Sequence, residues 1–236
     1  IEFDNLHFRY LETEPEVLID ISLTIPKGSR VGIVGKTGSG KSTLMDILMG
    51  LLEPTGGRIR VDGKAIDAAN QNCWRQRIAH VPQHIYLSDA SITENIALGV
   101  RPERIDPERV HQAARQAQIA EFIESHRQGY ETRVGERGVQ LSGGQRQRIG
   151  IARALYKKAD VLVFDEASSA LDTETETAVM QAVSQLDPNL TLFIIAHRVQ
   201  TLRECDQVIR LEEGRIIANG TYDDVITANA EASTPA

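Results

Sequence analysis

A glycine-rich segment in the first fifth of the chain carries residue types that bind polyphosphates. Residues 35–42 read Gly-Lys-Thr-Gly-Ser-Gly-Lys-Ser and fit the pattern G-x-x-x-x-G-K-[ST]. Glycines let successive backbone N–H groups turn toward one anion, and a following helix adds the positive end of its dipole. Lys41 is expected to bridge the β- and γ-phosphates of a nucleotide, and the Ser42 hydroxyl to bind Mg²⁺. A chance glycine turn is the weaker alternative.

Two adjacent carboxylates, Asp165 and Glu166, follow an apolar run predicted to be a buried strand. Ligands of doubly wound sheets bind beyond the carboxyl ends of the strands, so these acids are expected to share a crevice with the glycine-rich loop. Neighbouring side chains on an extended backbone point apart. This favours Asp165 for the Mg²⁺ shell and Glu166 for an attacking water, with a plain helix cap as the alternative.

A second anion site is predicted at residues 141–145, Leu-Ser-Gly-Gly-Gln, which precede a predicted helix. Ser142 suits an N-cap, two glycines expose N–H groups, and the helix dipole points at the same place. The helix carries Arg146, Arg148 and Arg153. Taken by themselves, these residues favour a capped helix with a solvated basic face over an anion site. In a chain that already has a phosphate-binding loop, the pentapeptide is a far more specific signal for an anion site.

Strands and helices alternate around these motifs, which predicts an α/β fold. An antiparallel β layer is expected from residues 1–10, 17–25 and 57–61, the last followed by the Asp62-Gly63 turn. The remaining segments predict buried strands at 30–34, 161–164 and 192–196, helices at 42–52, 144–156 and 173–186, and a hairpin at 210–217. Between them, the capping pattern Ser91–Glu94 and a helix predicted to start at Asp106-Pro107 and to run through Gln118 indicate a helical insertion.

Composition fits one globular domain with a sizeable core: 236 residues, 41% of them hydrophobic. A net charge of -7 disfavours a nucleic-acid partner. Cys73 and Cys205 lie far apart without metal-like spacing, so both are predicted to be reduced. Apolar runs stay far below the roughly 18 residues of a membrane span. A start at Ile1, without Met, favours an excised fragment.

Taken in order, the motifs resemble the nucleotide-binding domain of an ATP-binding cassette (ABC) transporter over nearly the whole chain. The resemblance implies roles in catalysis for Lys41, Gln83, Glu166 and His197, and Mg²⁺ binding by Ser42, Gln83 and Asp165. It implies ATP contacts from an adenine-stacking aromatic, the phosphate-binding loop (residues 35–43), the signature (residues 141–145) and the D-loop aspartate, namely Tyr10, Gly35, Lys36, Thr37, Gly38, Ser39, Gly40, Lys41, Ser42, Thr43, Leu141, Ser142, Gly143, Gly144, Gln145 and Asp172.

Three of these positions have structural alternatives when the family is set aside. Tyr10 could cover the end of a strand, His197 could be a core histidine, and Gln83 could be a surface amide. Two further segments resemble exporter-type members: residues 132–138 match T-x-V-G-E-x-G, and residues 91–96 match S/T-I-x-x-N-I. Residues 84–90 are similar to the corresponding segment of half-transporters that flip lipid-linked oligosaccharides.

The resemblance implies one domain over residues 1–236: a P-loop NTPase core with a mostly parallel sheet, an N-terminal antiparallel β subdomain and a helical subdomain over about 84–145. It implies ATP hydrolysis with Mg²⁺, a head-to-tail dimer with a second copy, and a transmembrane domain, fused N-terminally, at the cytoplasmic face of a membrane. Two alternatives are a soluble DNA-repair or chromosome-maintenance ABC ATPase and a module that senses ATP without hydrolysis.

Overall fold

The computed structural model describes residues 1–165, 189–195 and 199–227, and its contacts divide the chain into two compact units. Unit 1 comprises residues 1–78 and 189–236, and unit 2 comprises residues 79–188. The helix expected at 173–186 lies outside the described residues. No helix in the described ranges combines the length and apolar character that a bilayer span requires.

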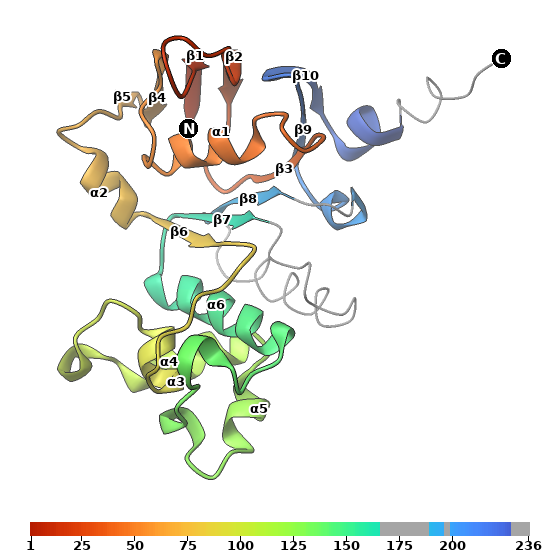
Figure 1. Ribbon diagram of the computed structural model, residues 1–236. Helices are drawn as coiled ribbons and strands as arrows, with labels where there is room; N and C mark the ends of the chain where they lie inside the picture. Colours follow the sequence, from red (N-terminus) through yellow and green to blue (C-terminus); the bar gives the residue numbers. More distant parts are fainter. Residues whose placement is uncertain (166–188, 196–198, 228–236) are drawn as a thin grey trace. The chain divides into compact units, whose positions relative to one another are not determined.

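An antiparallel sheet with the strand order β2-β1-β4-β5 forms one layer of unit 1 (Figure 1). Its strands are β1 (Glu2–Phe8), β2 (Leu18–Thr24), β4 (Gly56–Val61) and β5 (Lys64–Ala65). The alternation expected over residues 17–25 changes phase at Asp20, which has φ 55°. Leu6 pairs with Ile21 but Phe8 pairs with Leu18, so Leu18 and Ile21 both point into the core, and each is 0% exposed. The β layer itself is confirmed.

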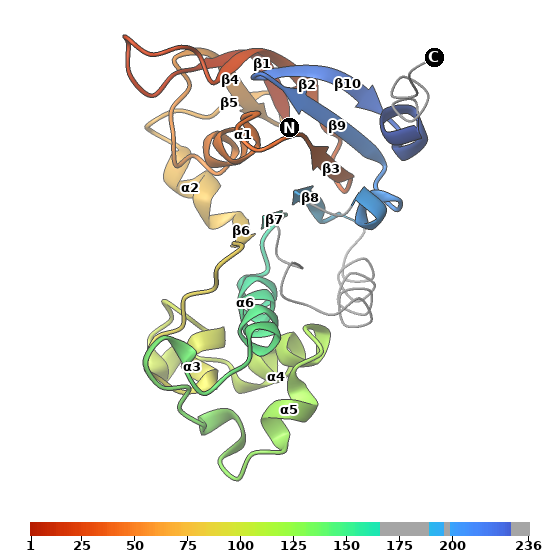
Figure 2. The ribbon, with the colours of Figure 1, turned by 45° about the vertical axis from the view of Figure 1, so that its right-hand side comes forward.

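A second group of strands in unit 1 supplies the buried sheet that carries the phosphate-binding loop. Strand β3 (Arg30–Val34) pairs in parallel with β8 (Thr191–Ile195) and β9 (Gln207–Glu212), and β10 (Arg215–Gly220) pairs antiparallel with β9. Every residue of β8 is buried, as expected for a strand that is covered on both faces. Helix α1 (Lys41–Leu48) lies between the antiparallel sheet and β3 (Figures 1 and 2).

In the described part of unit 2, residues 79–165, helices predominate, as the sequence predicts for the helical insertion. It contains β7 (Val161–Asp165) beside β6 (Ile78–Val81), and the helices α3 (Ile92–Ile96), α4 (Pro107–Gln116), α5 (Ala120–Glu124) and α6 (Gly143–Lys157). Helices α3 and α4 pack on α6. Helix α2 (Gln71–Gln76) belongs to unit 1, and five short turns of 3-10 or π helix complete the described elements, at Pro102–Arg104, Gly129–Glu131, Glu136–Gly138, Val199–Leu202 and Asp223–Thr227.

The α/β class is confirmed, while two helix ends differ from expectation. Helix α1 ends at Leu48 rather than near residue 52, because the chain turns at Gly50 with φ 68°. Helix α4 ends at Gln116 rather than 118, because Gln118 adopts φ 55°. In both places one left-handed residue stops the helix, which hydrophobic periodicity alone does not reveal.

Candidate nucleotide-binding site

The phosphate-binding loop leaves the carboxyl end of β3 and leads into α1. Gly40 is the N-cap of α1, with φ 101° and no side-chain capping bond, so no side chain occupies the first N–H groups of the helix. A Cβ at Gly40 would lie 2.7 Å from Leu18 Cδ2, in a backbone conformation that other residues rarely adopt. The turn therefore requires glycine and leaves helix donors open to an anion.

The side chain of Lys41 folds back over the loop that precedes it. Its Nζ donates to the carbonyl oxygens of Gly35 at 2.8 Å and Lys36 at 3.0 Å. Ser39 Oγ is buried without a hydrogen-bond partner among the described residues, and Ser42 is exposed on the first turn of α1. A held ammonium, open N–H groups and an unpartnered hydroxyl together fit the chemistry of a polyphosphate.

Tyr10 is held by its hydroxyl while much of its ring stays accessible. Tyr10 is 55% exposed, and its hydroxyl lies 3.0 Å from Thr43 Oγ1 on α1. Phe8, the last residue of β1, meets its ring edge-on, with ring centroids 5.0 Å apart. Tyr10 therefore packs at the end of the strand and also offers an accessible aromatic side chain in the same unit as the loop.

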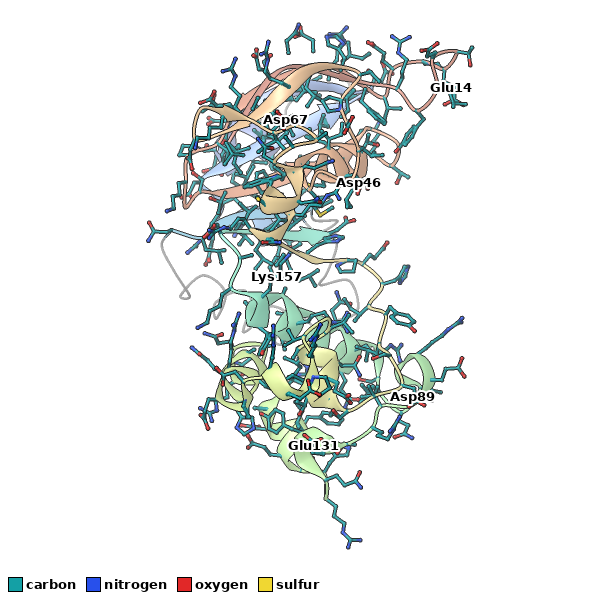
Figure 3. The ribbon with its side chains drawn as sticks, turned by 90° about the vertical axis from the view of Figure 1, so that its left-hand side faces the viewer. Glu14, Asp46, Asp67, Asp89, Glu131 and Lys157 are labelled. Atoms are coloured by element: carbon teal, nitrogen blue, oxygen red, sulfur yellow. The ribbon has the colours of Figure 1, made fainter. Side chains whose placement is uncertain are left out.

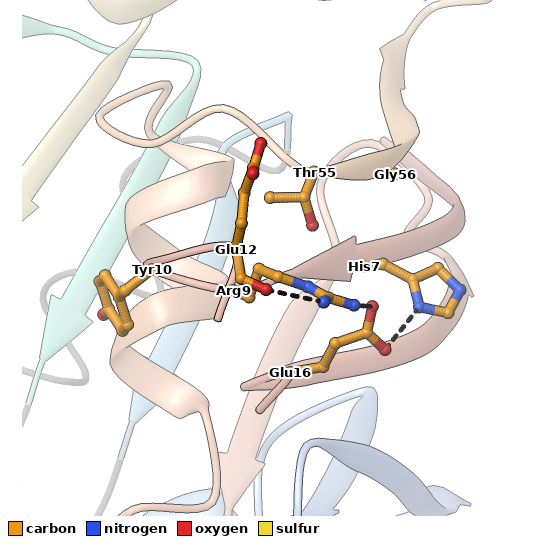
Figure 4. Close-up of a pocket in the computed structure, with 7 residues that line it drawn as sticks. All are labelled: His7, Arg9, Tyr10, Glu12, Glu16, Thr55 and Gly56. Carbon is orange, nitrogen blue, oxygen red and sulfur yellow. Dashed lines mark hydrogen bonds and ion pairs between the residues drawn. The ribbon is translucent and has the colours of Figure 1, made fainter. Parts of the chain in front are cut away.

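A cavity of about 700 Å³ borders Tyr10 (Figure 4). Glu16 lines it and pairs with Arg9 at 2.7 Å and with His7 Nδ1 at 3.2 Å. These contacts, the hydrogen bond from Arg9 above all, lower the pKa of the Glu16 carboxyl. Arg9 directly follows β1 and Glu16 comes shortly before β2, so the ion pair holds together the two ends of the loop that contains Tyr10. The full lining is His7, Arg9, Tyr10, Glu12, Glu16, Thr55 and Gly56.

The signature forms the N-terminus of α6 in unit 2. Ser142 is its N-cap: its Oγ accepts from Gln145 N at 3.2 Å, and Gln145 Oε1 accepts from Ser142 N at 2.8 Å. This capping box leaves the N–H groups of Gly143 and Gly144 between the two partners, with Ser142 itself exposed. Leu141 is buried and anchors the turn. The geometry is that of an exposed helix N-terminus with two glycine donors.

The basic residues of α6 do not form the solvated face that physics alone favoured. Arg146 donates to the Leu141 carbonyl at 2.7 Å, and Arg153 donates to the carbonyls of Asn95 and Tyr86 at 2.9 and 3.1 Å. Burial lowers the pKa of the Arg153 guanidinium. That expectation was therefore wrong for these two residues: Arg146 bonds to the turn directly before the helix, and Arg153 meets backbone carbonyls from a distant segment.

The remaining expected site residues divide between unit 2 and the undescribed part of the chain. Gln83 is exposed in the loop after β6, and Asp165 ends β7 half-buried. Glu166, Asp172 and His197 lie outside the described residues. In the ranges that the structure covers, no three His, Cys, Asp or Glu side chains gather as a metal site. Thus the loop and Tyr10 come together in unit 1, while the signature, Gln83 and Asp165 belong to unit 2.

The two exporter-like segments contact each other within unit 2. Ser91 and Arg133 form an isolated antiparallel bridge, and Ile92 N donates to Thr132 O at 3.0 Å. Thr93 Oγ1 donates to Glu131 at 3.0 Å, and Arg133 lies 3.8 Å from Asp89; Figure 3 labels both acids. Two motifs read separately in the sequence are therefore one structural feature.

Gln147 and Gly150 carry no motif signal in the sequence, yet both contact the segment that holds Gln83. Gln147 Nε2 donates to Pro82 O at 3.3 Å, and a Cβ at Gly150 would lie 2.3 Å from Ile85 Cδ1. The only available signal was a polar residue and a glycine spaced by three inside a predicted amphipathic helix.

Comparisons with known proteins agree with this geometry. A family model described as ABC transporter matches residues 18–169. An ATP-dependent lipid A-core flippase of Chromohalobacter salexigens is 45% identical over 226 residues, which are 96% of this chain and 39% of that protein. The Beta-(1→2)glucan export ATP-binding/permease protein NdvA of Agrobacterium fabrum is 48% identical over 225 residues, 95% of this chain and 38% of that protein.

A solved structure, titled as a bacterial Atm1-family ABC exporter with ATP bound, superposes with a TM-score of 0.90 at 38% identity. The match covers 99% of this chain and 42% of that one. The chain thus spans about two-fifths of the length of the relatives that it matches.

Proposed function

Because the chain belongs to the ABC transporter family, we propose that it is the ATP-binding and ATP-hydrolysing part of an exporter-type transporter. The observation that carries the proposal is the loop geometry: Lys41 folded over the carbonyls of Gly35 and Lys36 at the uncapped start of α1. That arrangement offers the Lys41 ammonium and several backbone N–H donors to a triphosphate. Tyr10 would stack on the base, a contact worth roughly 1 to 3 kcal/mol that tolerates different bases.

Oxygen donors in the chain suit Mg²⁺, which prefers a few protein ligands beside phosphate and water oxygens. The exposed Ser42 hydroxyl, the Gln83 amide oxygen and the Asp165 carboxylate would hold the ion. Bound there, Mg²⁺ would neutralise the charge that develops on the β- and γ-phosphate oxygens. Glu166 would orient and deprotonate the attacking water, and His197 would contact the γ-phosphate; both roles rest on the family pattern.

Two separate anion sites in one chain favour an active site shared between two copies. The loop in unit 1 and the signature in unit 2 each present a helix N-terminus. In a head-to-tail dimer, Ser142 and Asp172 of one copy would approach the ATP held by Lys41 of the other. Phosphoryl transfer depends on positioning and charge neutralisation more than on covalent chemistry, so donors from two chains can combine.

A membrane domain is the second partner that we propose. The relatives whose names include a permease are much longer than this chain, which covers 38% of NdvA. We expect the transmembrane part to be fused N-terminally and this chain to act at the cytoplasmic face, with residues 84–145 as its helical subdomain. The export and flippase names of the relatives give no support to a DNA-maintenance role.

Phosphate release by the Glu166→Gln variant tests the proposal. The amide keeps the shape of the side chain but cannot accept a proton, so hydrolysis is expected to fall about 10²- to 10⁴-fold while ATP still binds. Lys41→Ala serves as the comparison that loses binding as well. Turnover near wild type in Glu166→Gln would remove Glu166 from catalysis, and an absence of ATP-dependent phosphate release from the wild-type chain would favour the ATP-sensing alternative.

A further inference from the structure

Three residues on α6 contact the chain segment around Gln83. Gln147, Gly150 and Arg153 are spaced by three, which places them on one side of the helix. The segment that leaves β6 passes α6 on its way to α3 in Figure 1, and all of these residues belong to unit 2. The contacts between them therefore lie within one compact unit.

Hydrogen bonds from α6 hold the main chain on both sides of Gln83. Gln147, only 2% exposed, donates from Nε2 to the carbonyl of Pro82 at 3.3 Å. Arg153 donates from Nη2 to the carbonyl of Tyr86 at 3.1 Å, and from Nε to the carbonyl of Asn95 at 2.9 Å. The guanidinium thus joins three elements: α6, the last turn of α3 and the segment after Gln83. Bonds to a charged donor are the stronger kind.

Between these two anchors, Ile85 sits where a larger residue on α6 would collide with it. A Cβ added to Gly150 would lie 2.3 Å from Ile85 Cδ1 and 2.8 Å from its Cγ1. Any side chain at position 150 would have to push the Ile85 side chain away. Because β-branched side chains are stiff at χ1, the backbone near Gln83 would be displaced with it.

The side chain of Gln83 is left available by this arrangement. It is exposed and makes no hydrogen bond within the part of the chain that the structure describes. Further along, Asn95 Oδ1 accepts from Ser88 N at 3.0 Å and its Nδ2 donates to Ser88 O at 3.1 Å, which fixes the far end of the segment. A fixed backbone with an unused amide is the arrangement expected of a residue that reaches toward a ligand.

We infer that Gln147, Gly150 and Arg153 are positioning residues for Gln83, and that α6 makes Gln83 and the signature move together. Ser142 caps α6, and Gln147, less than two turns further along the same helix, donates to the carbonyl of Pro82. The inference rests on the proposed function, in which Gln83 serves the ATP of its own chain and Ser142 the ATP of the partner. Helix α6 would then link the two ATP sites of a dimer through rigid contacts.

A double-mutant cycle tests the inference in the full chain. Gln83→Ala is expected to raise the Mg²⁺ concentration for half-maximal hydrolysis at least about 10-fold, because losing an oxygen ligand should cost no less than losing one of the outer contacts that support a ligand. Arg153→Met should shift it in the same direction, because the carbonyls of Tyr86 and Asn95 lose their donor. The double variant should be no worse than the poorer single variant. Arg115→Met, on the exposed side of α4, is the matched control and should leave the Mg²⁺ dependence unchanged.

Two further measurements test the inference even if Arg153→Met does not hydrolyse ATP. Limited digestion with chymotrypsin, without nucleotide, should cut after the exposed Tyr86 several-fold faster in Arg153→Met than in Arg115→Met, because the carbonyl of that bond is released. Gly150→Ala should also raise the Mg²⁺ requirement, and Ile85→Ala in the same chain should restore it by removing the colliding atoms.

The inference would be overturned if the increases in Mg²⁺ requirement from Gln83→Ala and Arg153→Met multiplied in the double variant. An unchanged Mg²⁺ requirement in Arg153→Met would overturn it too, as would a Gly150→Ala defect that Ile85→Ala does not relieve. Failure of the proposed function looks different: Lys41→Ala would then release phosphate as fast as wild type.

Discussion

Tyr10 illustrates how one side chain can be fixed without being buried. Its hydroxyl contacts Thr43 Oγ1 at 3.0 Å, yet the residue is 55% exposed. Ring and hydroxyl can therefore be separated by substitution. If stacking is the main contribution, the ring alone should carry most of the binding energy for the base.

We predict that Tyr10→Phe binds ATP within about 2- to 3-fold of wild type, since it loses only one neutral hydrogen bond. Tyr10→Ala should weaken binding by about 5- to 100-fold, which is the equivalent of one lost stacking contact. Titration with a fluorescent ATP analogue would measure both. Equal affinities for the alanine variant and wild type would favour the simpler role of covering the strand end.

The two cysteines should differ sharply in reactivity. Burial raises the pKa of the Cys205 thiol to about 12, whereas Cys73 is exposed on α2. Because the thiolate is the nucleophile, iodoacetamide at pH 8 should modify Cys73 and spare Cys205 in the folded chain. Mass spectrometry should find one adduct in the native protein and two after unfolding. Comparable labelling of Cys205 in the native state would contradict the burial.

Among the elements, α3 depends on the side chain of Asn95. Asn95 is 0% exposed and bonds to the backbone of Ser88 in both directions, while its Nδ2 also donates to Ser91 O at 3.0 Å. It is the asparagine of the S/T-I-x-x-N-I pattern. The pattern therefore encodes a buried turn in unit 2.

Asn95→Leu should lower the free energy of unfolding by about 2 to 4 kcal/mol, because it leaves several buried backbone groups without partners. Urea denaturation would give the value. As a control, Gln112→Leu on the exposed side of α4 should change the stability by less than about 0.5 kcal/mol. A loss of the same small size for Asn95→Leu would mean that water replaces the lost bonds.

Local signals predicted most elements, and long-range contacts account for what was missed. The caps at Ser91, Asp106 and Ser142 follow from adjacent residues, and the structure has all three. The phase change at Asp20 and the end of α1 at Gly50 each depend on one residue with left-handed backbone conformation. Periodicity within a segment cannot report them.

The site divides in the same way. The loop and the signature are local motifs, so the sequence alone predicted their residues and the helix starts that they occupy. The contacts of Gln147 and Arg153 join segments more than fifty residues apart, and the bridge between Ser91 and Arg133 joins segments about forty residues apart. Such contacts arise from packing of α6, α3 and their neighbours, which no single segment encodes.

For the chain as a whole, the central claim is an ATP site completed by a second copy. Each unit presents a helix N-terminus with glycine N–H donors, and a single nucleotide held by the loop would leave the second of these anion sites unused within its own chain. A shared site predicts that two inactive variants can restore each other. Lys41→Ala removes the cation of the loop, and Ser142→Arg places a bulky cation at the start of α6.

Phosphate release from an equal mixture of these two variants is the most direct test. In a mixed dimer one composite site carries both lesions and the other carries none, so about a quarter of the wild-type sites should be intact after random pairing. Each variant alone should stay inactive, with circular dichroism verifying that both are folded. The account predicts recovered activity in the mixture. A mixture that stays inactive, although sizing shows mixed dimers, would contradict it.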